Sequence, residues 1–184
     1  MDDTFAETFA PLIGLPCWGV EHGQGSMLSF EFGEPRLMIR EPFVSASPSA
    51  EMRASAARRR VRPVGEWHLF VFCCRWRASA SGTLSAEDES AQDRIGVAVR
   101  DFDGQRLTRF ALDAAERRAT FGFDLGAVLE TWPYADDDGE QWSLYRPDGR
   151  VLTYRADGAV SHDPGDTHPD RIVWRAAEGS VRVP

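Results

Sequence analysis

Alternation of apolar and polar residues, the pattern of half-buried β-strands, runs through most of the chain. In "MLSFEFG" it places Leu28, Phe30 and Phe32 on one side of a strand, which we expect to face the core. Further strands are predicted from "PRLMIREP", "GEWHLFVFCCRWR", "QRLTRFAL", "ATFGFDLG", "AVLETWPY", "QWSLYRP" and "RVLTYRA". Turn residues such as Pro147-Asp148-Gly149 separate the late strands, so these should be sequential antiparallel neighbours.

A helical pattern is confined to one region. Ile95, Val99 and Phe102 recur at roughly helical spacing until Gly104, which predicts one amphipathic helix near residues 91–102. The fold class is therefore α+β, a predominantly antiparallel β-sheet of about nine strands with this single helix.

The length of the chain and the positions of its predicted elements indicate its domain organisation. A chain of 184 residues has the size of one domain. Its first ordered element is expected from Leu12, and we expect a single compact domain over residues 1–160. Residues 161–184 are predicted to be a C-terminal loop with a candidate edge strand.

A segment rich in Ser, Ala and Arg interrupts the strands. The text "SASPSAEMRASAARRR" from Ser45 to Arg60 has almost no large apolar residue, which predicts a mobile loop or a frayed, solvated helix. The arginines Arg58, Arg59, Arg60 and Arg62 are either an anion or partner contact or an ordinary solvated cluster.

The two halves of the chain resemble each other over residues 12–77 and 105–160. "FEFGEPRL" and "FDLGAVL" match in residue type, as do "GEWHLFVF" and "GEQWSLYR", in the same order. This predicts a two-fold internal repeat of β-meanders, in which Glu31 and Asp124 occupy equivalent places. Such carboxylates suit general acid–base chemistry or a divalent metal, although alternation also puts each acid on a solvent face.

The net charge of the chain limits the kinds of partner that it can bind. The formal net charge of -8 disfavours direct nucleic-acid binding, which needs a basic surface. No apolar stretch near the N-terminus approaches the ~20 residues that span a bilayer, so no membrane association is expected. Three cysteines, an odd number with two of them adjacent, argue against a disulfide framework and favour a cytoplasmic location.

Cys73 and Cys74 stand at the end of an apolar run. If this run is a strand, the residues on both of its faces are apolar. We interpret this run as a central strand, with the two thiols buried and inert. Cys17 stands apart and is the better candidate for a reactive thiol.

No cofactor is predicted, because the chain contains neither a phosphate-binding loop nor a dinucleotide fingerprint. A zinc site needs close pairs of Cys or His ligands, and these are lacking. His162 and His168, with Asp163, Asp166 and Asp170, are at most a weak metal site, so no metal is predicted either.

The acidic run of Asp136, Asp137 and Asp138 with Glu140 lies between two predicted strands. It is the candidate partner-binding site, where it would steer a basic protein, or else a solvated turn.

The text "LIGLPCWGVEHGQGSMLSFEFGEPRLMIREP", followed by "GEWHLFVFCCRWR", resembles an uncharacterised family of bacterial proteins of similar length. Members share a Gly-x-Pro-Cys-Trp-Gly segment, a Gly-Ser strand entry and a Trp-His-Leu strand with Cys-Cys-x-Trp. Small acidic proteins of this style are similar to immunity proteins of toxin systems.

Two functional hypotheses follow. The first is a non-catalytic cytoplasmic binding protein, of the immunity type, whose acidic surface covers a basic protein partner. The alternative is a small hydrolase or ligand-binding enzyme that uses Cys17 or the Glu31/Asp124 pair.

Overall fold

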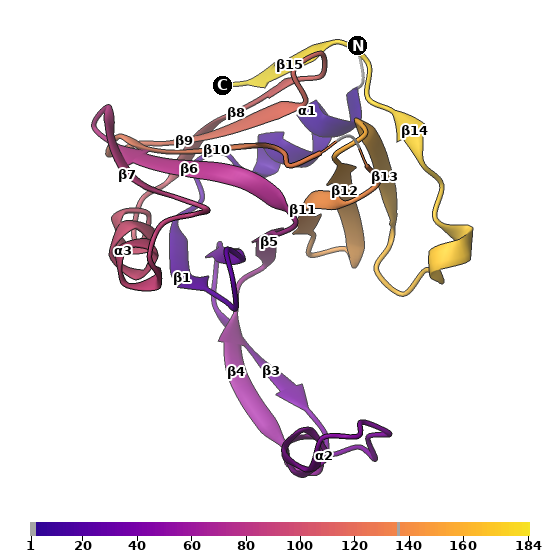
Figure 1. Cartoon of the computed structure of the whole chain (residues 1–184). Coiled ribbons are helices and arrows are strands. Elements are labelled where there is room, and N and C mark those ends of the chain that lie inside the picture. The colour runs from indigo at the N-terminus through magenta and orange to yellow at the C-terminus, as the bar shows by residue number, and fades with distance from the viewer. Residues whose placement is uncertain (1–2, 136) are drawn as a thin grey trace.

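The computed structural model describes residues 3–135 and 137–184, and within them the chain forms fifteen strands in three antiparallel sheets (Figure 1). The predominantly antiparallel α+β class is therefore confirmed. The expected number of about nine strands is too small. For example, a two-residue turn at Ser81-Gly82, with φ of 50° and 78°, folds residues 83–87 back as a further strand that the sequence pattern did not predict.

The two large sheets hold thirteen of these strands in the described residues. The seven-stranded sheet has the order β1 (Cys17–His22), β2 (Leu28–Phe32), β5 (Trp67–Val71), β11 (Glu140–Tyr145), β12 (Arg150–Arg155), β13 (Ala159–Pro164), β14 (Arg175–Ala176). The six-stranded sheet has the order β15 (Ser180–Val183), β8 (Leu107–Asp113), β9 (Arg118–Phe123), β10 (Ala127–Pro133), β6 (Cys74–Ala80), β7 (Thr83–Glu87).

One hydrophobic core lies between the two large sheets. Trp142 of the seven-stranded sheet contacts Phe110 and Phe121 of the six-stranded sheet, with ring centroids 5.8 and 5.9 Å apart. The expected inward residues Phe30 and Phe32 are fully buried in this core. Alternation along each strand thus supplies one apolar face per sheet, and the two faces pack together.

Short helices close the open sides of this core. α1 (Asp3–Phe9) inserts Phe5 and Phe9, both fully buried, and the Phe9 ring stacks on Phe110 with centroids 3.6 Å apart. α1 lies before the first element expected from the sequence. A seven-residue helix is too short to be stable alone, so the stability of α1 comes from this packing.

The helix expected near residues 91–102 is present as α3 (Gln92–Ala98), which continues into a 3₁₀ turn over Val99–Asp101. It packs against β7 and β1, the edge strands of the two large sheets. Phe102 follows it and places its ring 5.6 Å from Phe30, inside the core. The helix is one of three α-helices in the described residues, so the expectation of a single helix was wrong.

The run that ends in the two adjacent cysteines does not form a single central strand. β5 ends at Val71 and β6 begins at Cys74, and these strands belong to different large sheets. Cys73 sits at the crossing with φ of 51° and is exposed, whereas Cys74 is buried. Leu69 and Val71 therefore face the core from β5, whereas Phe70 is half-buried on the outer face of β5 and Phe72 lies in the crossing.

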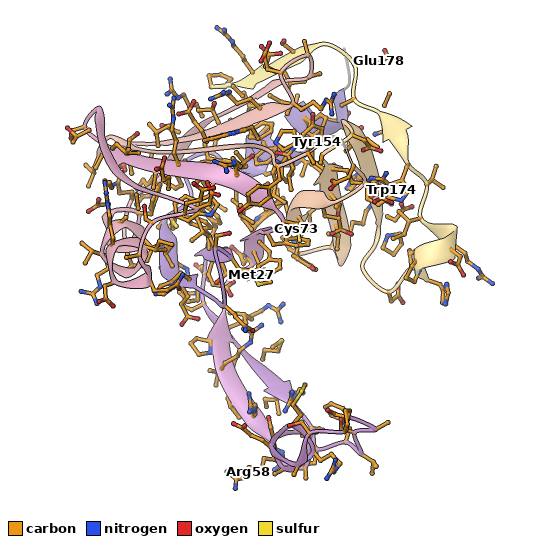
Figure 2. The ribbon with its side chains drawn as sticks, in the orientation of Figure 1. Met27, Arg58, Cys73, Tyr154, Trp174 and Glu178 are labelled. Atoms are coloured by element: carbon orange, nitrogen blue, oxygen red, sulfur yellow. The ribbon has the colours of Figure 1, made fainter. Side chains whose placement is uncertain are left out.

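A two-stranded arm projects from the body of the protein (Figure 1). We use "arm" for residues 36–64: β3 (Arg36–Arg40), β4 (Arg60–Val64) and the connection that holds α2 (Ala50–Ala56) at the tip. Arg58 marks its far end in Figure 2. Ser49 caps α2 by accepting a hydrogen bond from the Met52 amide, so the segment predicted as a loop or a frayed helix contains a capped helix.

The two expected repeat halves contribute strands to both large sheets. β5 of the first half pairs with β11 of the second, and β6 pairs with β10. The internal repeat stays a prediction about the sequence and does not mark a boundary between sheets. The C-terminal segment over residues 161–184 includes the edge strands β14 and β15.

Phe9→Ala should reduce the free energy of unfolding by about 3–5 kcal/mol, because it leaves a cavity beside Phe110 and Trp142. Urea unfolding monitored by tryptophan fluorescence measures the change. Phe43→Ala is the matched control, since Phe43 is 52% exposed on the arm, and it should cost less than about 1 kcal/mol. Equal losses in the two variants would contradict a core role for α1.

Candidate functional site

A row of polar and aromatic side chains crosses the outer face of the seven-stranded sheet. Glu31 of β2, His68 of β5 and Tyr145 of β11 are direct cross-strand neighbours. Their sequence neighbours Phe32 and Leu69 point the other way, into the core. Because side chains alternate along a strand, packing the core puts this row on the opposite face.

The Glu31 carboxylate is held at both oxygens. Oε1 lies 3.1 Å from His68 Nδ1, and Oε2 accepts a hydrogen bond from the Gly65 amide at 2.9 Å. A Cβ at position 65 would lie 2.5 Å from the Phe32 carbonyl oxygen, so the close approach of this backbone to β2 requires a glycine. Burial raises the pKa of Glu31, but the bonds from His68 and Gly65 and the charge of Arg62 outweigh it, and the pKa lies below its usual value.

A cavity of about 450 Å³ opens over this row at the root of the arm. One wall is the outer face of the sheet, and the other is the face of the arm that carries Arg36, Met38, Arg62 and Val64. The lining residues are Glu31, Arg36, Met38, Arg62, Val64, Gly65, Glu66, His68, Phe70, Tyr145 and Arg146.

The Glu31–His68 pair has a defined chemistry. A carboxylate at Nδ1 orients the imidazole and favours the tautomer with a proton on Nδ1. Among the described residues His68 Nε2 has no hydrogen-bond partner, so it is available to accept a hydrogen bond or a proton from a molecule in the cavity. Burial raises the pKa of Tyr145, so its phenol remains neutral beside the imidazole.

The two carboxylates expected to act together have separate partners. Glu31 contacts His68 and Gly65, whereas Asp124 accepts a hydrogen bond from the Arg106 amide at 2.9 Å. Asp124 follows β9 in the other large sheet and is exposed. No contact joins the two carboxylates in the described residues, so the relevant partner of Glu31 is His68.

The cysteines divide into two kinds. Cys17 and Cys74 are buried, at 0% and 1% exposure, and this burial raises the pKa of both thiols far above neutral pH. Cys17 is therefore protonated and poorly suited to act as a nucleophile. The expectation of a buried thiol is right for Cys74 and wrong for Cys73, which lies at the surface crossing between sheets (Figure 2).

The acidic run lies in the connection between β10 and β11. Asp136 falls outside the described residues. Asp138 has an 85% exposed side chain and lies 4.0 Å from Arg155, while Asp137 accepts a hydrogen bond from the Gly139 amide. Glu140 begins β11 and is half-buried. The described acids thus line an exposed loop that a partner can reach.

The candidate metal ligands are dispersed. Arg146 places its guanidinium 3.3 Å from the His162 imidazole, and burial together with Arg150 and Arg146 lowers the pKa of His162. His168 lies in an exposed loop and contacts Asp170. Within residues 3–135 and 137–184, no three His, Cys, Asp or Glu side chains are grouped to hold a metal ion.

Reasoning from the sequence missed the Glu31–His68 pair. Each residue is a polar position inside an otherwise apolar strand, in "FEF" and "WHL", and that is the one local signal of a special role. Their contact depends on the pairing of β2 with β5, across a separation of 37 residues.

Comparison with protein-family models, with curated proteins and with solved structures gave no significant match to this chain. None of the helices in the described part of the chain has the length and apolar character needed to cross a bilayer.

Cys73 should be the one thiol that reacts rapidly with a disulfide reagent in the native protein, because it is exposed while Cys17 and Cys74 are buried. Unfolding in urea should release the other two. The absorbance of the released thiolate counts the reacting thiols, and Cys73→Ser should abolish the rapid phase. Rapid native reaction of Cys17 would contradict this assignment and restore the thiol hypothesis.

Glu31→Gln should lower the free energy of unfolding at neutral pH by about 1–3 kcal/mol, because it weakens charge-assisted hydrogen bonds. The pKa of Glu31 is lowered by folding, so its stabilisation is complete above the unfolded value of about 4.3 and is lost as pH falls through the folded value. The difference between wild type and variant should therefore shrink in acid, as urea titrations at several pH values will show.

The matched control is Glu66→Gln, which changes an exposed carboxylate in the same cavity and should cost less than about 0.5 kcal/mol. A constant difference between wild type and Glu31→Gln down to strongly acidic pH would show that Glu31 is not a carboxylate stabilised by folding.

Proposed function

We propose that the chain is a non-catalytic binding protein and that the arm is its main contact surface for a protein partner. The observation that supports this proposal is an exposed apolar face on the arm. Leu37 and Ile39 of β3 and Val61 of β4 share that face, and their exposed fractions are 69%, 57% and 55%. The opposite face of the arm lines the cavity.

An exposed apolar face on a two-stranded sheet is unusual in a protein that has no binding partner. A two-stranded sheet by itself is at best marginally stable in water, and further packing is needed to stabilise it. Burying a Leu, Ile or Val side chain contributes roughly 1.5–3 kcal/mol. A partner that covers the three side chains would therefore both bind and stabilise the arm.

The charges of the arm and of the rest of the chain are opposite. Residues 36–64 contain seven Arg and two Glu, a formal charge of +5, while the remaining residues contain 14 Arg and 27 Asp or Glu, a formal charge of -13. The arm therefore suits a partner surface that is apolar at its centre and acidic at its rim. The body suits a basic surface.

An immunity-type role in the cytoplasm is the particular form of this proposal. In this role the rest of the chain outside the arm covers a basic partner. The exposed loop with Asp137, Asp138 and Glu140 is the contact that the positive charge of the partner favours. The arm then holds an apolar patch of the same partner or of a second one. Support for this form comes from the opposite net charges of the arm and the rest of the chain, and from the resemblance of the sequence to small acidic immunity proteins.

The enzyme hypothesis keeps less support. The Cys17 thiol is buried, and Asp124 does not join Glu31. Among the described residues that line the cavity none is a Ser, Thr, Cys or Lys, and burial raises the pKa of the Tyr145 phenol, which disfavours its use as a nucleophile. The Glu31–His68 pair therefore favours the recognition of a small molecule over covalent catalysis.

Leu37→Ser combined with Ile39→Ser should weaken binding to the partner about tenfold or more, because the variant loses apolar contact area. The probes are the individually purified products of the genes that flank this one. Calorimetric titration of each into the wild-type chain identifies the partner and then measures the variant.

Leu84→Ser is the matched control, since Leu84 is 46% exposed on β7 of the body, and it should leave affinity unchanged. Asp137→Asn with Asp138→Asn tests the acidic loop separately and should weaken the binding of a basic partner. The arm proposal is wrong if the partner binds the arm variant as tightly as the wild type, or if none of these products binds.

A further inference from the structure

We propose that the cavity at the root of the arm binds a small aromatic carboxylate, which bridges the arm and the seven-stranded sheet. The site uses Arg36 and Arg62 for the carboxylate and the outer-face row around His68 for the aromatic body. This inference goes beyond the proposed protein contact, which uses the opposite face of the arm.

The charge of the cavity indicates an anion. Glu31 is already satisfied at both oxygens by His68 and Gly65, and Glu66 accepts the Glu34 amide at 3.2 Å. Arg36 and Arg62 stand on neighbouring strands of the arm, and among the described residues neither forms an ion pair within 4.0 Å, although the charge of Arg62 acts on Glu31 from further away. Both oxygens of Glu31 and one oxygen of Glu66 are thus engaged, whereas the guanidinium groups of Arg36 and Arg62 have no ion pair in the described part of the chain and remain to bind an anion.

The walls of the cavity suit a flat apolar body. The His68 ring has two aromatic neighbours on this face, Phe70 on the same strand and Tyr145 on the adjacent strand, with ring centroids 6.3 and 5.6 Å away. Met38 and Val64 supply apolar surface from the arm side. Aromatic rings favour stacked or edge contacts with another ring, and about 450 Å³ lies within the usual size of small-molecule sites.

His68 adds selectivity for a hydroxyl group. With Nδ1 held by Glu31, Nε2 is the ring nitrogen left to bond a ligand, and in the neutral form of an imidazole this nitrogen accepts a hydrogen bond. A ligand with a hydroxyl on its aromatic ring would donate to Nε2 while its carboxylate meets the two arginines. Glu31 is then a positioning residue, because it acts on the ligand through the orientation of His68.

Such a ligand would connect the arm to the body. Arg36 and Arg62 belong to β3 and β4, whereas His68 and Phe70 belong to β5. Contacts on both sides restrain the arm relative to the sheet. Occupancy of the cavity would therefore change how freely the apolar face of the arm meets a protein partner.

The test is calorimetric titration of the full chain with two probes of different length, 4-hydroxybenzoate and 4-hydroxycinnamate. At least one should bind saturably at a single site. Arg36→Gln and Arg62→Gln should each raise its Kd about tenfold or more, which is the effect of losing a charge-assisted hydrogen bond. The matched control Arg58→Gln removes the same charge at the tip of the arm and should leave Kd unchanged (Figure 2).

Two further comparisons test the chemistry of the site. The uncharged methyl ester of the better probe should lose most of the affinity. In the wild type the hydroxylated probe should bind more tightly than its analogue without the hydroxyl, and His68→Gln, which can still donate to Glu31, should remove that preference. Amide hydrogen exchange in β3 and β4 should slow when the probe is bound.

The proposal is overturned if neither probe binds, if the ester binds as well as the acid, or if Arg58→Gln weakens binding as much as Arg36→Gln and Arg62→Gln. Unchanged exchange in the arm would overturn the bridging geometry. None of these measurements needs the protein partner, so failure here is distinguishable from failure of the proposed protein contact.

Discussion

The indole of Trp142 packs among aromatic rings from both large sheets and from α1, and the placement of the other elements depends on this contact. The ring centroids of Phe9, Phe110 and Phe121 lie 5.8–5.9 Å from that of Trp142 and within 6.0 Å of one another. Aromatic side chains bury large areas and prefer edge or offset contacts, so this cluster sets the distance and orientation of the two sheets. α1 and α3 then cover the sides that the sheets leave open.

The same packing creates the candidate site on the opposite side of one sheet. Once Phe30, Phe32 and Leu69 are committed to the core, the strand period of two forces Glu31 and His68 outward. An outward acid would ordinarily be solvated. Here the root of the arm covers Glu31, which is only 7% exposed, and the cavity between arm and sheet results.

The arm relates the two proposals. Its two faces differ, because one carries exposed apolar side chains and the other presents arginines to the cavity. A protein partner and a small ligand would therefore use the same two strands without competing for the same face. In the proposed role, the opposite charges of the arm and of the rest of the chain would make each surface selective for a different kind of partner.

Local pattern was sufficient for the antiparallel class, for the inward faces of "MLSFEFG" and for the helix near residues 91–102, because alternation, helical spacing and turn residues are properties of neighbouring positions. Tertiary structure alone decided the rest. The crossing at Cys73, the packed helix α1, the arm and the contact of Glu31 with His68 depend on which distant strands pair. Strand pairing is a non-local choice among many registers of similar local pattern, and only the packing of the whole core selects one of them.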